Sequence, residues 1–135
     1  MPHQISYRVY YEDTDAAGVV YYANYLKFAE RARTEALRES GYNQSHLLKN
    51  EDLAFAVVRV EVDYRKPARL DDVILVETSL QELKSASMTM HQNLKVGDVE
   101  VARAIVTLAC VSKDMRATRI PEQIRTSLTN LLGQE

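Results

Sequence analysis

The stretch Asp13–Gly41, DTDAAGVVYYANYLKFAERARTEALRESG, holds a polar turn followed by a single long helix. From about Ala23 to Ser40, apolar residues recur at spacings of three and four, which is the period of a helix with one buried face. That face comprises Tyr25, Phe28, Ala29, Ala32 and Ala36. Gly41 suits the position after a helix, because glycine takes a left-handed backbone at little cost. The stretch therefore predicts one long amphipathic helix early in the chain.

Most of the remaining chain alternates between apolar and polar residues, a period of two that indicates β-strands. We predict strands over residues 5–11, 58–64, 73–83, 87–96 and 99–112. Gly97-Asp98 has the composition of a hairpin turn. Within the last strand, Ala104–Val111 is almost unbroken apolar sequence, which predicts burial on both faces. A short helix with one apolar face should begin near Pro121.

The predicted order is strand, long helix, four strands and short helix. Consecutive strands with hairpin-length connections favour an antiparallel sheet, and the long helix can cover one of its faces. We therefore expect an α+β fold of about five antiparallel strands, with residues 1–135 as a single domain. Such a sheet has edge strands that need covering, so we also expect a homo-oligomer.

The composition carries no strong charge bias. It is 46% hydrophobic and 27% charged, with a formal net charge of −2, so the overall charge does not favour nucleic acid or anionic lipid as a partner. The single cysteine, Cys110, excludes an intrachain disulfide and is expected in the core. No apolar stretch approaches the roughly 20 residues of a spanning helix, and no apolar signal segment opens the chain. We expect a cytoplasmic protein without membrane insertion.

Two carboxylates, Asp13 and Asp15, lie in the turn before the long helix. A calcium loop would need acidic residues where this chain has Ala17 and Asn24, so we expect no metal. Asp13 suits a turn or capping role, in which its carboxylate accepts backbone N–H groups. Asp15 lies beside the unpaired N–H groups of a helix N-terminus. A carboxylate next to oriented amide donors is the minimum that hydrolysis of an acyl group requires.

Aromatic and basic residues add candidates for a binding site. Six of the eight tyrosines lie within residues 7–25, and several tyrosines around one acid can form the wall of a pocket for an acyl or aryl group. Lys66 and Arg69 lie in a basic segment, and Lys84 and Ser85 lie at another strand end. These four residues are either solvated loop residues or contacts to the phosphates of a ligand such as coenzyme A.

The sequence lacks the motifs of several other enzyme classes. It contains no Gly-x-Ser-x-Gly elbow, P-loop or Gly-x-Gly-x-x-Gly, which disfavours a serine hydrolase or a nucleotide-binding fold. His3, His46 and His91 have no metal-ligand spacing, so we interpret them as surface or incidental residues.

The segment Tyr10–Tyr21, YYEDTDAAGVVY, followed by Asn24-Tyr25, resembles the signature of the hotdog-fold acyl-CoA thioesterases of the 4-hydroxybenzoyl-CoA thioesterase family. Glu30–Glu35 and Pro67–Asp72 further resemble the YbgC-type branch, which is associated with the Tol–Pal envelope system. The resemblance spans nearly the whole chain. It implies the hotdog fold, in which an antiparallel sheet wraps around one long central helix.

The resemblance also implies a function. An acyl-CoA or, as the alternative, an acyl-carrier-protein thioester would be hydrolysed to the free acid and the thiol, without a metal or cofactor. Asp15 would be the catalytic nucleophile or general base, and the backbone N–H of Tyr22 would bind the thioester oxygen. Gly18, Val19 and Tyr25 of the matched motif would contact the substrate. Family members are dimers or tetramers with sites between subunits, which implies a homodimer or a homotetramer here.

One position departs from the YbgC-type branch, which usually carries histidine where this chain has Tyr22. A tyrosine hydroxyl can hydrogen-bond a ligand but does not shuttle protons at neutral pH as histidine does. The 4-hydroxybenzoyl-CoA branch also lacks this histidine. Hydrolysis is therefore our first expectation, and a non-catalytic module that binds an acyl ligand or an envelope protein is the alternative. A hydratase of the same fold is disfavoured, because no histidine has a matching context.

Overall fold

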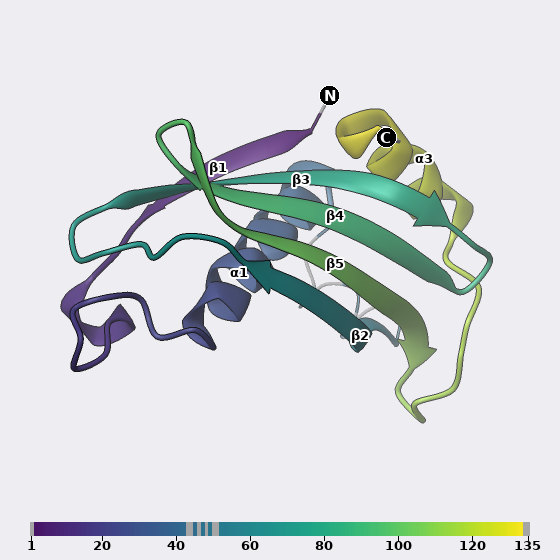
Figure 1. Cartoon of the computed structure of the whole chain (residues 1–135). Helices are drawn as coiled ribbons and strands as arrows, with labels where there is room; N and C mark the ends of the chain where they lie inside the picture. Colours follow the sequence, from purple (N-terminus) through teal and green to yellow (C-terminus); the bar gives the residue numbers. More distant parts are fainter. Residues whose placement is uncertain (1, 43–44, 46, 48, 50–51, 134–135) are drawn as a thin grey trace.

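Five strands form one antiparallel sheet in the order β1-β3-β4-β5-β2 within the computed structural model, which describes residues 2–42, 45, 47, 49 and 52–133 (Figure 1). The strands are β1 (His3–Arg8), β2 (Leu53–Tyr64), β3 (Val73–Leu83), β4 (Ser87–Val96) and β5 (Val99–Ser112). The other elements are the 3-10 helix η1 (Tyr11–Asp13) and the helices α1 (Asn24–Glu39) and α3 (Glu122–Leu132). The predicted α+β fold with an antiparallel sheet is confirmed.

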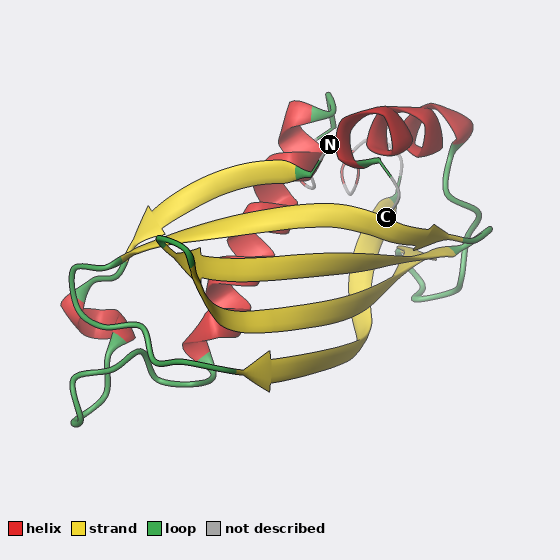
Figure 2. Ribbon diagram, turned by 45° about the horizontal axis from the view of Figure 1, so that its top comes forward, coloured by secondary structure: helices red, strands yellow, loops and turns green. Residues whose placement is uncertain are grey.

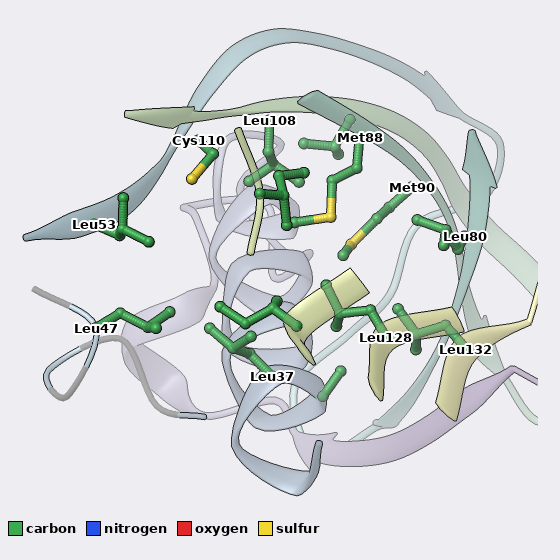
Figure 3. Packing of buried hydrophobic residues seen from close by; sticks show 14 of the residues in the cluster. Leu37, Leu47, Leu53, Leu80, Met88, Met90, Leu108, Cys110, Leu128 and Leu132 are labelled. Atoms are coloured by element: carbon green, nitrogen blue, oxygen red, sulfur yellow. The ribbon is translucent and has the colours of Figure 1, made fainter. Parts of the chain in front are cut away.

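The long helix α1 lies across one face of the sheet, which curves around it (Figures 1 and 2). Each residue of its predicted apolar face is buried, because the helical period places all of them toward the strands. Gly41 follows the helix with a φ of 104°, as expected for a residue that ends it. α3 adds its own apolar stripe to the same core through Ile124, Leu128 and Leu132 (Figure 3).

The strand β5 corrects one prediction from the sequence. Residues Ala104, Val106, Leu108 and Cys110 are buried, whereas Ile105, Thr107 and Ala109 between them are only half-buried. The predicted burial of Ala104–Val111 on both faces is therefore wrong for a single chain. The physical reason is that the helices cover only one face of the sheet, so alternate residues of β5 point to the uncovered face.

The first strand is shorter than the predicted range 5–11, because it ends at Arg8. Beyond it, the N–H of Tyr10 donates to Oδ2 of Asp13 (2.8 Å), and residues 11–13 turn into η1. A nearby carboxylate thus offers this backbone an alternative to a sheet ladder.

The strand β2 begins at Leu53, earlier than predicted, and forms one edge of the sheet. Its register with β5 shifts between Val57 and Arg59. This irregularity interrupts the two-residue alternation, which explains why the sequence pattern shows only the second half of the strand. Val57 and Val58 are 50% and 61% exposed, so the edge is both unpaired and apolar within one chain.

Candidate active site

The loop before α1 is a short hairpin that presents Asp15 at its tip. The N–H of Asp15 donates to the carbonyl of Val19 (2.9 Å), and Thr14 and Val20 form a bridge next to this pair. Gly18 closes the tip with a φ of 81°, a left-handed conformation that favours glycine. Asp15 is exposed, and its Oδ1 accepts the N–H of Ala17 (2.8 Å). Its second oxygen has no hydrogen-bond donor in the described part of the chain, so it is available to a ligand.

Asp13 ties this hairpin to the start of α1. Its side chain is buried, and Oδ2 accepts the N–H of Tyr10. Its carbonyl accepts both the N–H of Tyr21 (3.0 Å) and the side-chain amide of Asn24 (2.9 Å), the first residue of α1. The interpretation of Asp13 as a turn acid is confirmed, because its carboxylate is used for a backbone contact. Asn24 was not among our predicted site residues, although an asparagine at a helix start is a usual capping signal.

The N-terminus of α1 keeps free donors. No side chain caps it, and no acidic residue lies in its first turn. Among the described residues, none accepts a hydrogen bond from the backbone N–H of Tyr22 or of Ala23. Both donors lie where the helix dipole is positive, a place that favours an oxygen with negative charge. The Tyr22 N–H, predicted to bind the thioester oxygen, is therefore unpaired and beside the loop that carries Asp15.

Three aromatic rings form a wall beside the helix start. Tyr22 packs edge-on against Tyr64, with ring centroids 5.9 Å apart, and Tyr64 also contacts Tyr25 (5.6 Å). Tyr25 is buried and its hydroxyl accepts the N–H of Ala68 (3.0 Å). Burial is the main cause that raises the pKa of Tyr25, so its hydroxyl stays neutral and serves to position the wall.

These rings and Lys66 border one surface hollow of about 260 Å³. The fold thus brings together Tyr22, Tyr25 and Lys66 from our predicted set. It also adds Tyr64, which sequence reasoning missed because nothing in the alternation of β2 distinguishes that tyrosine from an ordinary strand residue.

The other residues predicted to contact the substrate lie in two separate parts of the molecule. Val19 bridges to Arg69, so Gly18, Val19 and Arg69 lie together beside Asp15. Lys84 and Ser85 follow the far end of β3, which at about 3.3 Å per residue extends roughly 33 Å. Figure 1 shows the turn between β3 and β4 at the opposite end of the sheet from the loop before α1.

Contacts within the chain already engage Lys84 and Ser85. Lys84 pairs with Glu82 (3.5 Å), and the Ser85 hydroxyl accepts a hydrogen bond from Arg119 (3.4 Å). One chain does not bring these two residues to Asp15.

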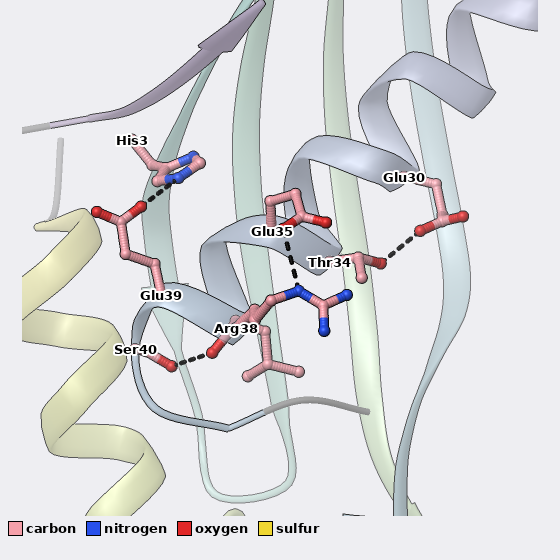
Figure 4. Close-up of polar contacts among 8 residues, drawn as sticks. His3, Glu30, Thr34, Glu35, Arg38, Glu39 and Ser40 are labelled. Atoms are coloured by element: carbon pink, nitrogen blue, oxygen red, sulfur yellow. Dashed lines mark hydrogen bonds and ion pairs between the residues drawn. The ribbon is translucent and has the colours of Figure 1, made fainter. Parts of the chain in front are cut away.

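The histidines need one correction. His3 is buried rather than at the surface, and its Nε2 lies 2.7 Å from a carboxylate oxygen of Glu39 at the end of α1 (Figure 4). The reason is that β1 begins directly beside this helix end, a contact between residues far apart in sequence. His91 is half-buried on β4, and His46 lies outside the described residues. Among the residues described, no cluster of His, Cys, Asp and Glu could hold a metal ion.

Two further predictions, the burial of Cys110 and the lack of a membrane-spanning helix, can be compared with the structure. Cys110 is fully buried, which confirms the prediction that it is a core residue. Burial raises the pKa of its thiol. In the described part of the chain, no helix is both long and apolar enough to cross a membrane.

Comparison with known proteins gives a consistent result. Residues 9–128 match the family model described as the Thioesterase-like superfamily. The chain is 43% identical over 125 residues to the acyl-CoA thioesterase YbgC of Haemophilus influenzae, covering 92% of both chains. It is 40% identical over 119 residues to the acyl-CoA thioester hydrolase YbgC of Escherichia coli O157:H7, covering 87% of this chain and 88% of that one.

A solved structure agrees with these relatives. The probable thioesterase of Bartonella henselae superposes with a TM-score of 0.87 at 34% identity, covering 90% of this chain and all of that one. The predicted hotdog fold and the resemblance to acyl-CoA thioesterases are thereby confirmed. On the matched residues, the relatives and the sheet topology, the chain belongs to the thioesterase-like superfamily.

Proposed function

We propose that this protein hydrolyses acyl-CoA thioesters, with Asp15 as the reacting carboxylate and the N–H of Tyr22 as the donor to the thioester oxygen. One observation carries the proposal. The hairpin that presents Asp15 is tied, through Asp13 and Asn24, to a helix N-terminus whose first donors are unpaired. The names of the relatives, acyl-CoA thioesterase and acyl-CoA thioester hydrolase, support the same reaction.

The geometry serves the charge that develops during the reaction. When a nucleophile adds to the thioester carbon, negative charge moves to the carbonyl oxygen. An N–H fixed at the positive end of α1 stabilises that charge, and one such donor contributes roughly 2.7–4 kcal/mol in comparable hydrolases. Because the donor belongs to the backbone, the replacement of histidine by Tyr22 leaves this part of the chemistry intact.

Two routes fit the position of Asp15. In the first, a carboxylate oxygen attacks the carbonyl carbon, the carbon–sulfur bond breaks, the thiolate takes a proton, and water then hydrolyses the mixed anhydride. In the second, Asp15 takes a proton from water, the water oxygen attacks the same carbon, and the proton passes to the departing thiolate. A single turnover in ¹⁸O-labelled water tests for the first route, because label enters the Asp15 carboxylate only when water opens the anhydride at the aspartyl carbonyl.

The central test replaces Asp15 with asparagine. Asp15→Asn should keep the melting temperature and lower kcat by at least about a hundredfold, the size of a general-base contribution. Glu12→Gln is the matched control, since Glu12 is an exposed acid of the neighbouring η1 turn. Equal turnover by wild type and Asp15→Asn would remove Asp15 from the mechanism. Measuring turnover of acyl-CoA and acyl-carrier-protein thioesters of the same acyl group shows which of the two thiol carriers the protein accepts.

We further propose that the protein works as a homo-oligomer joined through the edge of β2. Its exposed backbone and the side chains of Val57, Val58 and Val60 can pair with a second copy across a two-fold axis. Such an assembly lets another subunit supply Lys84 and Ser85 to the site. Light scattering of wild type and of Val58→Lys tests this arrangement, because a charge on the edge should shift the protein toward monomer. A dimer or tetramer that Val58→Lys leaves unchanged must use another surface.

A further inference from the structure

A groove runs along one side of α1, between that helix and the edge strand β2. It consists of a hollow of about 300 Å³ that begins at Leu26 and a second of about 260 Å³ deeper in the fold. Both are lined by Glu30, Arg33 and Val57, so they adjoin one another at these side chains. The floor of the deeper part is apolar, and Figure 3 shows Met88, Met90 and Leu108 of the sheet facing the helix. We call this feature the α1 groove.

Arg33 is a charged residue within this apolar surrounding. Its Nη1 donates to Oε1 of Gln92 (3.0 Å), a fully buried residue of β4. The amide of Gln92 in turn donates to the carbonyl of Ala29 and to the hydroxyl of Thr78, both at 2.9 Å. Because all of these contacts are satisfied, Gln92 is fixed and holds the guanidinium in one orientation.

Within one chain, the hydrogen-bond partner of Arg33 is the neutral Gln92, and the charge of Glu30 compensates that of the guanidinium only in part. In the described part of the chain, no carboxylate forms an ion pair with Arg33. Desolvation by burial lowers the pKa of Arg33, and the charge of Glu30 opposes this only in part. A guanidinium has five N–H donors, and Gln92 accepts from one of them. A half-buried cation with several unused donors is suited to a planar anion such as a carboxylate.

The charges around the groove point to a ligand with one negative charge. Lys27 and Arg33 contribute two positive charges to its lining, and Glu30 contributes one negative charge. Glu30 accepts a hydrogen bond from the hydroxyl of Thr34 (Figure 4) and forms no ion pair with either cation. One carboxylate on a ligand would therefore balance the groove.

The position of Arg33 along the helix sets the part of the substrate that it can reach. Arg33 lies eleven residues beyond Tyr22 and ten beyond Ala23, which is roughly 15–17 Å along the helix direction at 1.5 Å per residue. An acyl group whose carbonyl lies at the helix start and whose chain follows the α1 groove reaches Arg33 when its length matches that distance.

We propose that Arg33 binds a carboxylate at the far end of the acyl group, so that the preferred substrates are CoA monothioesters of dicarboxylic acids. The inference rests on the proposed function, because that function supplies the position of the thioester carbonyl.

The test compares straight-chain acyl-CoAs in pairs of equal length, one ending in a methyl group and the other in a carboxylate. At the length that reaches Arg33, wild type should prefer the carboxylate by about tenfold or more in kcat/KM, the factor expected for one hydrogen bond to a charged group. Arg33→Met should abolish or reverse this preference, chiefly through KM, and Arg33→Lys should retain part of it. The ratio within one preparation does not depend on the fraction of folded enzyme.

Arg38→Met is the matched control, because Arg38 lies on the exposed side of the same helix and pairs with Glu35 (3.0 Å, Figure 4). It should leave the ratio at the wild-type value. If Arg33→Met does not fold, Arg33→Lys takes its place, and a ratio in Arg33→Lys equal to that of wild type overturns the inference. Wild type without a preference for the carboxylate at any length overturns it as well.

Two other outcomes are distinguishable. If Arg33→Met changes the oligomeric state while the ratio stays at its wild-type value, Arg33 pairs with a second copy of the chain, and the inference is wrong although hydrolysis stands. If wild type cleaves neither member of any pair, the proposed function itself fails.

Discussion

Asp13 and Asp15 carry the same functional group two residues apart, yet their replacement by asparagine should have different consequences. The Oδ2 of Asp13 accepts the N–H of Tyr10 at 2.8 Å, and the residue is 8% exposed. Asparagine keeps an acceptor oxygen in that place, so Asp13→Asn should preserve the hairpin. Alanine removes the acceptor and leaves the Tyr10 N–H without a partner. Loss of such a bond to a charged group costs about 1.5–3 kcal/mol.

That free energy translates into a measurable change in melting temperature. For a domain of this size, 1 kcal/mol shifts Tm by roughly 3–5 °C, so Asp13→Ala should melt roughly 5–15 °C below wild type. Alanine keeps the backbone carbonyl that accepts from Tyr21 and Asn24, so the hairpin stays tied to α1 and kcat should fall far less in Asp13→Ala than in Asp15→Asn. Asp13→Asn should stay within a few degrees of wild type and keep most of its turnover.

The assay is thermal unfolding alongside thiol release from a saturating acyl-CoA, measured well below the lowest Tm. Asp15→Asn gives the opposite pattern to Asp13→Ala, with unchanged stability and lost turnover. A loss of kcat in Asp13→Asn as large as that in Asp15→Asn would refute the reasoning, because it would show that the charge of Asp13, and not only its hydrogen bond, takes part in the reaction.

Three further predictions concern the support of the site and the sheet. Gln92→Leu should destabilise the fold by about 2–6 kcal/mol in denaturant titration, because it removes the partner of the half-buried Arg33 guanidinium and of the buried Thr78 hydroxyl, at about 1–3 kcal/mol each. The carbonyl of Ala29 keeps its hydrogen bond within α1. A loss below 1 kcal/mol would contradict the importance of that network. Gly18→Ala should lower the free energy of unfolding by about 1–2 kcal/mol, because alanine is strained at a φ of 81°. Turnover measured below the melting temperature should fall too, because the hairpin positions Asp15. Hydrogen bonding to Lys95 is the main cause that lowers the pKa of Glu77 below its ordinary value of 4.5. The resulting stabilisation is complete above pH 4.5 and is lost as the pH falls through the lowered pKa of the folded state. The difference in unfolding free energy between wild type and Glu77→Gln should shrink over that interval, and a difference that is constant with pH would count against the pair.

Local periodicity was sufficient to predict much of the fold. The bounds of β3 and β5 agree with the predicted ranges, and α1 agrees within a residue, because each of these elements presents one regular face to one core. Where a contact within a few residues competes with the regular pattern, the prediction failed. The carboxylate of Asp13 ends β1 early, and the irregularity at Val57 hides the first half of β2.

The chemistry of the site divides in the same way. The sequence pointed to Asp15 as a carboxylate before a helix start, and the family resemblance added the Tyr22 N–H. Both lie in a hairpin followed directly by a helix, a local arrangement that consecutive residues determine. The tertiary structure alone revealed Tyr64 in the aromatic wall, the burial of His3 against Glu39, and the fixation of Arg33 by Gln92. These contacts join residues that are between 36 and 59 positions apart, as in Arg33–Gln92 with a separation of 59. No periodicity encodes them, because they depend on which strand lies beside the helix and on how the sheet curves around it.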